Sequence, residues 1–261
     1  MIYQSPKNPN AHQTVKERKW PSYPTKQLLQ RGLIQGKVLD FGCGLGKDIG
    51  FLRNKGFHVV GYDPHYAPDY PTEKFDTILC HYVLNVLLPE EQTHVLLATS
   101  ELIKPTGNVY FTVRRDVKRN GFRWHVKRHV KTYQCNVKLP YPSVMQTEFC
   151  EIYGYQHLNQ RGLSTCLISP KQELLTESAT AYAVVVPKSL SNGHCWVIPK
   201  SSVQDYFTLS TREKQACWLL VDRVKYLIEQ QNQPQSYTVG FNTAMKLPDV
   251  PPVRIEVIPH Y

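Results

Sequence analysis

The sequence predicts an α/β protein in which a mostly parallel sheet with helices on both faces is followed by a smaller α+β domain. Two observations carry this prediction. Short apolar runs alternate with helical stretches over residues 1–160, and a single long helix dominates residues 161–261. Strands that alternate with helices form parallel sheets, because each crossover helix returns the chain to the same end of the sheet. We therefore expect two domains, 1–160 and 161–261.

The elements expected in the first part follow from the apolar runs and their glycine or proline boundaries. Helices are predicted over 25–32, 47–55 and 90–103. Strands are predicted over 37–41, 58–62, 75–80 and 108–113. Two later apolar runs, 133–139 and 149–157, predict a hairpin at the sheet edge, because antiparallel strands commonly close such a sheet.

The second part shows a different pattern. Its long helix is predicted over 211–231, where Ser210 and Glu213 form an N-cap and Pro234 follows the end. Strands are predicted over 181–186, 195–198, 236–242 and 253–258. One helix among several strands is typical of an α+β domain.

Composition excludes several classes of protein. The 261 residues contain no run that approaches the ~18 apolar residues of a membrane span. The N-terminal segment lacks the apolar core of a signal peptide, so we expect a cytoplasmic protein without membrane contact. Seven cysteines without a C-x-x-C pair indicate reduced thiols, and neither a disulfide framework nor a metal site is expected.

The charge is basic and unevenly distributed. The chain has 31 Lys and Arg against 21 Asp and Glu, which gives a formal net charge of +10. Residues 1–160 carry +8 of this charge and residues 161–261 carry +2. An anionic partner is therefore expected for the first part.

The most informative segment is VLDFGCGLGKD at 38–48. A buried strand runs here into a turn with glycines at alternate positions and then into a helix. Such glycines permit positive φ and let a ligand approach bare backbone. Nicotinamide and flavin sites require G-x-G-x-x-G, but Lys47 occupies the place of the third glycine. Asp40 would repel a pyrophosphate and suits a ligand with an ammonium group.

A second acid completes the pattern. Asp63 ends the next strand, where a carboxylate can accept both hydroxyls of a ribose. An ammonium, an adenosyl group and a ribose together describe S-adenosylmethionine (SAM). The segment resembles motif I of class I SAM-dependent methyltransferases, commonly written VLDxGCGxG, and this implies a Rossmann-like sheet. The cofactor-binding residues that the resemblance implies are Asp40, Gly42, Cys43, Gly44, Gly46, Tyr62, Asp63 and His81.

The sequence departs from this family after the second strand. Only eleven residues separate Asp63 from Phe75, too few for the helix and third strand that many members have there. The acid that often follows that strand cannot be assigned. Tyr62, Tyr66 and Tyr70 are candidates to cover the adenine, and surface or packing tyrosines are the alternative.

The acceptor is harder to infer than the cofactor. The segment 75–85, FDTILCHYVLN, contains neither N-P-P-Y nor a Pro-Cys, so neither known scheme of DNA base methylation is supported. His81 is a candidate general base beside the methyl group, and a packing histidine is the alternative. An acceptor that is already nucleophilic needs only in-line positioning.

A basic segment follows the strand expected at 108–113. Residues 114–131 hold eight Lys and Arg, two His and one acid, with Phe122 and Trp124 interleaved. Cations bind phosphates and aromatic rings stack on exposed bases, which favours nucleic acid. A solvated basic face and an acidic small substrate are the alternatives. The candidate substrate-binding residues are Arg114, Arg115, Lys118, Arg119, Arg123 and Trp124.

A narrower resemblance covers roughly residues 10–110. Its elements include HQTVK at 12–16, GYDPHY at 61–66 and YVLNV at 82–86. Together they look like the methyltransferases associated with DNA phosphorothioation, which implies a nucleic-acid context. His12 and Lys16 would then lie near the cofactor or substrate, and a mobile N-terminal arm is the alternative.

The second part resembles histidine-triad (HIT) proteins. The resemblance rests on segments 180–187, 193–200, 237–242 and 250–261, which read TAYAVVVP, GHCWVIPK, YTVGFN and VPPVRIEVIPHY. The three triad positions hold Pro252, Arg254 and Glu256, so the nucleophilic histidine of a HIT hydrolase is missing.

Two roles remain for this HIT-like domain. It binds a nucleotide or a nucleic-acid end, with Arg254 as a phosphate ligand, or it serves assembly, including a homodimer. A simpler alternative is that Arg254 and Glu256 pair with each other, since residues two apart on a strand face the same side.

We therefore expect a Rossmann-like class I methyltransferase sheet followed by an α+β HIT-like domain. The expected function is SAM-dependent methyl transfer to nucleic acid or a nucleotide-like acceptor, with a degenerate HIT-like domain for binding or assembly. Two alternatives stay open. One is a small-molecule methyltransferase for an acidic substrate, and the other is a non-catalytic SAM- or nucleotide-binding module of a DNA-modification or defence system.

Overall fold

The computed structural model describes residues 3–157, 173–178, 180–186, 189–201, 203–242 and 251–261. The chain divides into two compact units, Met1–His157 and Leu158–Tyr261, and each is described by itself. The predicted domain boundary at 160/161 falls within 158–172, outside the described residues. No helix among the described residues is long and apolar enough to cross a lipid bilayer.

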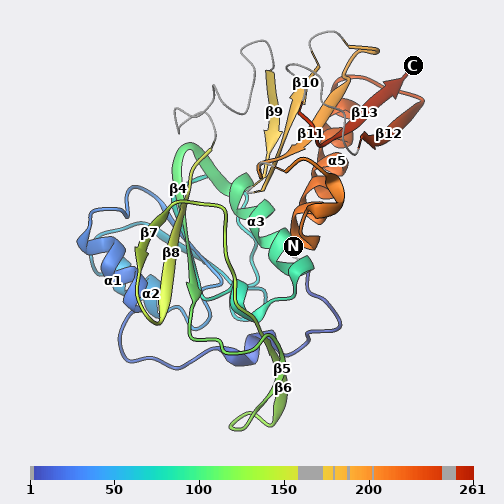
Figure 1. The fold of residues 1–261 in the computed structure, drawn as a ribbon. Coiled ribbons are helices and arrows are strands. Elements are labelled where there is room, and N and C mark those ends of the chain that lie inside the picture. Colours follow the sequence, from blue (N-terminus) through green and yellow to red (C-terminus); the bar gives the residue numbers. More distant parts are fainter. Residues whose placement is uncertain (1–2, 158–172, 179, 187–188, 202, 243–250) are drawn as a thin grey trace. The chain divides into compact units, whose positions relative to one another are not determined.

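A six-stranded mixed sheet forms the centre of the first unit (Figure 1). In chain order its strands are β1 (Val38–Phe41), β2 (Val59–Tyr62), β3 (Phe75–His81), β4 (Ile103–Arg114), β7 (Ser143–Gln146) and β8 (Cys150–Tyr155). Their order across the sheet is β2-β1-β3-β4-β8-β7. The first four strands are parallel, and β8 and β7 add an antiparallel edge. The predicted α/β class with a parallel sheet is therefore confirmed.

The described residues of this unit form three α-helices, α1 (Tyr23–Gln30), α2 (Lys47–Arg53) and α3 (Pro89–Leu102), and two short 3-10 helices, Ala11–Thr14 and Leu84–Val86. α1 begins after Ser22, whose side chain accepts a hydrogen bond from Thr25 N. α2 connects β1 to β2, and α3 connects β3 to β4. Because these crossovers lead in opposite directions across the sheet, right-handed connections place α2 and α3 on opposite faces.

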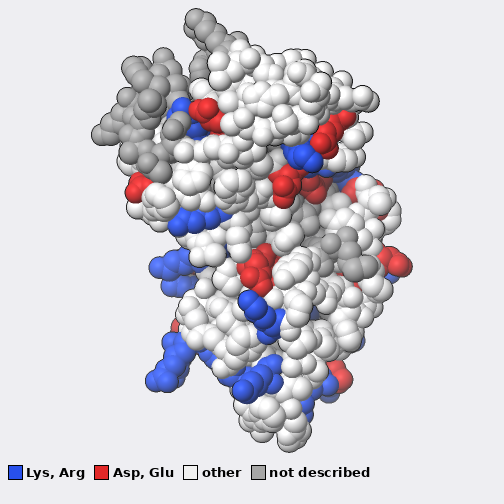
Figure 2. Space-filling model, turned by 90° about the vertical axis from the view of Figure 1, so that its right-hand side faces the viewer, with Lys and Arg blue, Asp and Glu red and all other residues white. Residues whose placement is uncertain are grey.

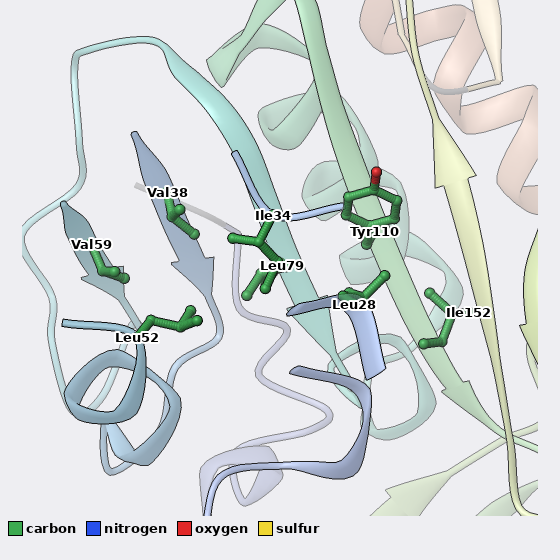
Figure 3. Packing of buried hydrophobic residues seen from close by; sticks show 8 residues of the cluster. All are labelled: Leu28, Ile34, Val38, Leu52, Val59, Leu79, Tyr110 and Ile152. Carbon is green, nitrogen blue, oxygen red and sulfur yellow. The ribbon is translucent and has the colours of Figure 1, made fainter. Parts of the chain in front are cut away.

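One core cluster joins α1 and α2 to the sheet. Figure 3 shows Leu28 of α1 and Leu52 of α2 beside apolar side chains from β1, β2, β3, β4 and β8. Consecutive residues of a strand face opposite sides, so only alternate residues of each strand can join this cluster. The members, all at most 4% exposed, are Leu28, Ile34, Val38, Leu52, Val59, Leu79, Tyr110 and Ile152.

The edge of the sheet beside β2 is shaped by the short connection to β3. The described residues of that connection form no helix or strand, and Asp63 and Ala67 make an isolated bridge instead. β2 is therefore an edge strand, and the connection lacks the helix and further strand for which the spacing leaves too few residues. Since β1 lies between β2 and β3, the connections leaving the carboxyl ends of β1 and β3 diverge and open a crevice between them.

The predicted hairpin of 133–139 with 149–157 is wrong. Two further strands form a separate two-stranded sheet: β5 (Gly121–His125) and β6 (Val130–Gln134). β8 pairs instead with β7. His129 in the left-handed region, with φ of +52°, closes the turn between β5 and β6. The basic segment 114–131 thus includes most of a hairpin that extends away from the main sheet (Figure 1).

The second unit is an antiparallel sheet with one long helix packed on it. Its strands are β9 (Glu173–Glu177), β10 (Ala181–Val185), β11 (Cys195–Pro199), β12 (Ser236–Asn242) and β13 (Arg254–His260), in the order β12-β13-β11-β10-β9. Helix α5 (Thr211–Gln231) begins at a capping box of Ser210 and Glu213. It buries one apolar stripe, Ala216, Cys217, Leu220, Val221, Val224 and Ile228. The α+β prediction is confirmed, and β9 was not predicted.

The core cluster predicts the effect of a truncation. Leu79→Ala should destabilise the first unit by about 2–5 kcal/mol, because Leu79 is fully buried and its removal leaves a cavity. Denaturant-induced unfolding of the full chain measures this. Leu190→Ala is the matched control, since Leu190 is 77% exposed, and should change stability by less than about 0.5 kcal/mol. Equal effects of the two variants would contradict the packing.

Candidate functional site

A cavity of about 540 Å³ lies in the first unit at the carboxyl ends of β1, β2 and β3. Its wall comes from the glycine loop after β1, the residues that follow β2 and β3, the hairpin β5–β6, and an N-terminal segment. We call this N-terminal segment, residues 3–18, the strap. A cavity of this size and position suits a small-molecule ligand or cofactor.

The glycine loop brings bare backbone to the cavity. Gly42 and Gly44 line it, and both have positive φ, +80° and +51°. A Cβ at Gly42 would collide with Val83, and one at Gly44 would come within 2.6 Å of Val15 Cγ2. Gly46, also at positive φ, is the N-cap residue of α2. Only glycine fits the first two positions, so the main chain itself forms this part of the wall.

Asp63 lies directly beside the glycine loop. Its Oδ2 accepts from Gly44 N at 3.1 Å, while Oδ1 accepts from His65 N at 3.0 Å and Tyr66 N at 3.1 Å. Three backbone donors thus fix the carboxylate in the cavity wall. The structure therefore brings together the glycines and the acid that the sequence placed at the ends of adjacent strands.

Asp40 occupies a different place from the other predicted cofactor ligands. It is 3% exposed and is not among the residues that line the cavity; neither are Gly46 and Tyr62. Burial, together with the nearby carboxylates of Asp48 and Asp63, raises the pKa of Asp40 to about 8, against the opposing effect of Arg18. A direct contact of Asp40 with an ammonium group stays a prediction.

His81 ends β3 and lines the cavity. Its Nδ1 is 2.7 Å from Thr112 Oγ1, and its Nε2 is buried without a hydrogen-bond partner among the described residues. Burial lowers the pKa of His81 to about 4, so the imidazole is neutral near pH 7. The next residue, Tyr82, has φ of +63°, a strained conformation for a tyrosine at the cavity wall.

The two cysteines nearest the site are not thiolates. Burial raises the pKa of Cys43, which lines the cavity, to about 12. Burial likewise raises the pKa of Cys80 at the end of β3. Both thiols therefore stay protonated at neutral pH, and nucleophilic catalysis by either is disfavoured.

The strap is tied to both helices that flank the cavity. Glu91 of α3 accepts from Ser5 N at 2.9 Å and from Asn8 Nδ2 at 2.8 Å. At the other end, Arg18 forms an ion pair with the buried Asp48 of α2 at 3.1 Å. These anchors hold the strap against the cavity, where it forms much of the wall. The sequence offered no signal for Asn8 or Arg18.

The middle of the strap carries two residues that a family resemblance had placed near the ligand. His12 and Lys16 both line the cavity. The His12 ring stacks on His65 at a centroid distance of 3.9 Å, and the Tyr66 hydroxyl donates to His12 O at 3.2 Å. In the described structure the strap therefore packs on the loop that follows β2.

The hairpin β5–β6 divides its residues between two faces. His125 and Gln134 line the cavity, whereas Phe122 and Trp124 are 48% and 56% exposed. Figure 2 shows Lys and Arg side chains over the lower part of the molecule, the end at which Figure 1 draws β5 and β6. The division of His125 from Phe122 and Trp124 follows from the alternation of side chains between the two faces of a strand.

The predicted substrate-binding residues also divide between the cavity wall and the exposed surface. Arg114 lines the cavity, held by Asp116 through two hydrogen bonds of 2.8 Å. Arg123 is half-buried and donates to Gln134 Oε1 at 3.4 Å. Outside the wall lie four exposed residues, Arg115, Lys118, Arg119 and Trp124.

Arg254 belongs to β13 of the second unit. It is 5% exposed, forms an ion pair with Glu256 at 2.8 Å, and lies 5.1 Å from the centre of the Trp196 ring. Its Nη1 donates to Pro251 O at 3.2 Å. The pairing of Arg254 with Glu256, the simplest of the alternatives, is what the structure shows. A phosphate-binding role for Arg254 stays a prediction.

Known proteins resemble this chain in part. A ubiquinone biosynthesis O-methyltransferase of Yersinia enterocolitica is 29% identical over 120 residues, which cover 35% of this chain and 49% of the relative. The chain thus spans about half the length of that curated relative. The expected link to phosphorothioation-associated methyltransferases stays a prediction.

Solved structures match with low scores. A HIT family protein from Bacillus anthracis is 22% identical with a TM-score of 0.32, over 34% of this chain and 64% of that one. A glycopeptide N-methyltransferase complexed with SAM is 11% identical with a TM-score of 0.31, over 59% of this chain and 83% of that one. Neither score supports an argument about this chain.

A match to a protein-family model covers more of the chain than the curated relative does. The model of a methyltransferase-domain family matches residues 16–207, which include the glycine loop, Asp63 and His81 and extend into the second unit. This range is more than half of the chain, and therefore the chain belongs to the methyltransferase-domain family.

Proposed function

We propose that this chain transfers a methyl group from SAM to nucleic acid or a nucleotide-like acceptor. The observation that carries the proposal is the contact of the glycine loop with Asp63 in the wall of one cavity, with Gly44 N and Asp63 Oδ2 3.1 Å apart. Bare backbone next to a fixed carboxylate suits an adenosyl group and its ribose.

The cavity fits SAM in size and in chemistry. Its volume of about 540 Å³ falls within the range of small-molecule and cofactor sites. Phe41, Val83 and Val86 supply apolar wall, and the buried Nε2 of His81 lacks a partner among the described residues. Bound SAM would supply an electrophilic methyl group on a sulfonium.

Each polar residue of the site has a distinct proposed role. Asp63 would accept hydrogen bonds from the ribose hydroxyls, and Gly42 and Gly44 would let the adenosyl part lie against the main chain. Asp40 lies behind this loop, where it would attract the ammonium group through the low-dielectric interior. A cation bound there would favour the ionised form of Asp40.

His81 is the proposed proton acceptor. When Nδ1–H donates to Thr112 Oγ1, Nε2 carries a free lone pair. That nitrogen can take the proton that an acceptor nitrogen or oxygen loses as it becomes methylated. For an acceptor that is already nucleophilic, the same wall needs only to position it.

The nucleic-acid acceptor is supported by the hairpin β5–β6. It joins the cavity through His125 and Gln134 and presents Phe122 and Trp124 on its outer face. The second candidate is an acidic small molecule. It is favoured by Arg114 in the cavity wall and by a curated relative whose name refers to ubiquinone biosynthesis.

We assign the second unit to binding or assembly, including a homodimer. Its triad positions hold Pro252, Arg254 and Glu256, and none of these side chains can act as the nucleophile of a HIT hydrolase. The ion pair of Arg254 with Glu256 indicates a structural role for this part of β13.

The first test of the function follows labelled methyl groups from SAM into the DNA, RNA, protein and small-molecule fractions of a cell extract. Label in nucleic acid is the expected outcome. Asp63→Asn should weaken SAM binding by at least about tenfold, because hydrogen bonds to a carboxylate contribute roughly 1.5–3 kcal/mol each. Calorimetry of SAM binding measures this.

Asp69→Asn is the matched control for that variant, since Asp69 is exposed and lies outside the cavity wall. Label in the small-molecule fraction alone would favour the second candidate. SAM binding without transfer to any fraction would indicate a non-catalytic module, and equal SAM affinity of the two variants would contradict the proposed ribose contact.

Asp40 predicts a pH-dependent stability. Its pKa of about 8 means that the folded protein keeps this proton between about pH 4 and pH 8, where the unfolded chain has lost it. The stability of the SAM-free protein should therefore fall as pH rises, by roughly 1.4 kcal/mol per pH unit from this group. Asp40→Asn should remove that slope and raise Tm at pH 8. An unchanged slope would contradict the assignment.

His81 predicts a flat pH profile. Because its pKa is about 4, titration of His81 should not lower the turnover rate between pH 8 and about pH 5.5. His81→Gln should keep a hydrogen bond to Thr112 and lose the proton acceptor, which lowers kcat about a hundredfold or more. A variant with wild-type kcat would show that His81 only packs.

A further inference from the structure

A second cavity, of about 400 Å³, lies between the strap and the tip of the hairpin β5–β6. Its wall consists of Val15, Lys16, Glu17, His125, Lys127 and Arg128. Val15, Lys16 and His125 also line the first cavity, so the two cavities adjoin. We call the second one the cationic pocket.

The cationic pocket has an excess of positive charge without internal partners. Three cations face one carboxylate, that of Glu17. Neither Lys127 nor Arg128 forms a side-chain hydrogen bond or ion pair with any residue that the structure describes. By contrast, Arg114 is held by Asp116, and Arg115 donates to Thr147 O at 3.0 Å. Cations left uncommitted beside a cavity are available to an anion.

A buried atom in the shared wall points to a ligand as well. His125 Nδ1 is buried and has no hydrogen-bond partner among the described residues. An unpaired buried ring nitrogen costs free energy, and a hydrogen-bonding group in either cavity would satisfy it. A phosphate oxygen in the cationic pocket would accept from Nδ1–H, from Lys127 and from Arg128.

The opposite face of the hairpin offers aromatic rings. Phe122 and Trp124 point to the same side of β5 and are largely exposed. Phe122 rests against Tyr133 of β6 at a centroid distance of 5.3 Å, and Trp124 pairs across the ladder with Lys131. Exposed rings with adjacent cations form a stacking surface for unpaired bases.

We infer that the hairpin and the strap bind a single-stranded segment of nucleic acid, with a phosphate in the cationic pocket and a base stacked on Trp124. Stacking on an aromatic side chain needs a base that is free of its own neighbours, which disfavours an intact duplex. The inference rests on the proposed function in one respect: it places the bound strand next to the cavity assigned to SAM.

The test uses the full chain and fluorescence anisotropy with a labelled 12-nucleotide strand, as DNA and as RNA, beside a duplex of the same sequence. The double variant Lys127→Ala, Arg128→Ala should bind either single strand at least about tenfold more weakly. Its dependence on salt should also be shallower, because each lost phosphate contact removes about 0.7 from the slope of log K against log salt. Trp124→Ala should weaken binding about tenfold and leave that slope unchanged.

Lys19→Ala with Lys55→Ala is the control, because it removes the same charge from exposed residues outside both cavities. The inference is overturned if the two double variants bind alike, or if the duplex binds as tightly as the single strands. It is also overturned if inorganic phosphate binds in the pocket while no oligonucleotide does. Calorimetry of SAM binding separates the two proposals. If the chain does not bind SAM, the proposed methyl-transfer function is refuted. If that chain still binds a single strand in a way that depends on Lys127 and Arg128, the present inference stands.

Discussion

The parallel pairing of β1 with both β2 and β3 is the constraint on which the site depends. Because β1 is flanked on both sides, the connections that leave the ends of β1 and β3 must diverge, and the crevice between them stays open. The same geometry brings Val83, after β3, so close to the loop after β1 that position 42 has room only for glycine. Sheet order, loop composition and cavity are consequences of one arrangement.

The strap completes this cavity through polar contacts that bury charge. Glu91 and Asp48 are both buried carboxylates, which are unfavourable unless hydrogen-bonded. Glu91 accepts from Ser5, Asn8 and the start of its own helix, while Asp48 accepts from Ser22 N and pairs with Arg18. Removing the strap would leave both acids short of partners, so we infer that it contributes to the stability of the fold as well as to the cavity wall.

What the sequence could predict depended on the range of the contacts. The glycine loop, Asp63 and the bounds of α5 rest on local signals: glycine spacing, a strand end, and the capping box of Ser210 with Glu213. The strap has no apolar periodicity, and its anchors join residues far apart in the sequence, Asn8 with Glu91 at one end and Arg18 with Asp48 at the other. No local pattern encodes such pairs.

Two further outcomes had physical causes that the sequence did not reveal. The hairpin was misplaced because 133–139 and 149–157 are both apolar, whereas the register of β5 with β6 depends on the left-handed turn residue His129. Asp40 was correctly placed on a buried strand, but its burial out of the cavity wall and its closeness to Asp48 of α2 depend on long-range packing. Burial then raises its pKa and leaves it neutral in the folded protein near pH 7.

The hairpin shows how one short element can serve two surfaces. Its period of two sends His125 and Gln134 to the cavity and Phe122 and Trp124 to solvent. Arginines near the cavity are held by Asp116 and Gln134, while the cations of the turn have no such partners among the described residues. The paired arginines stabilise the cavity wall. The cations of the turn, Lys127 and Arg128, can instead contact an anionic ligand. The segment that holds most of the basic excess of the first part therefore also contributes to the wall of the first cavity.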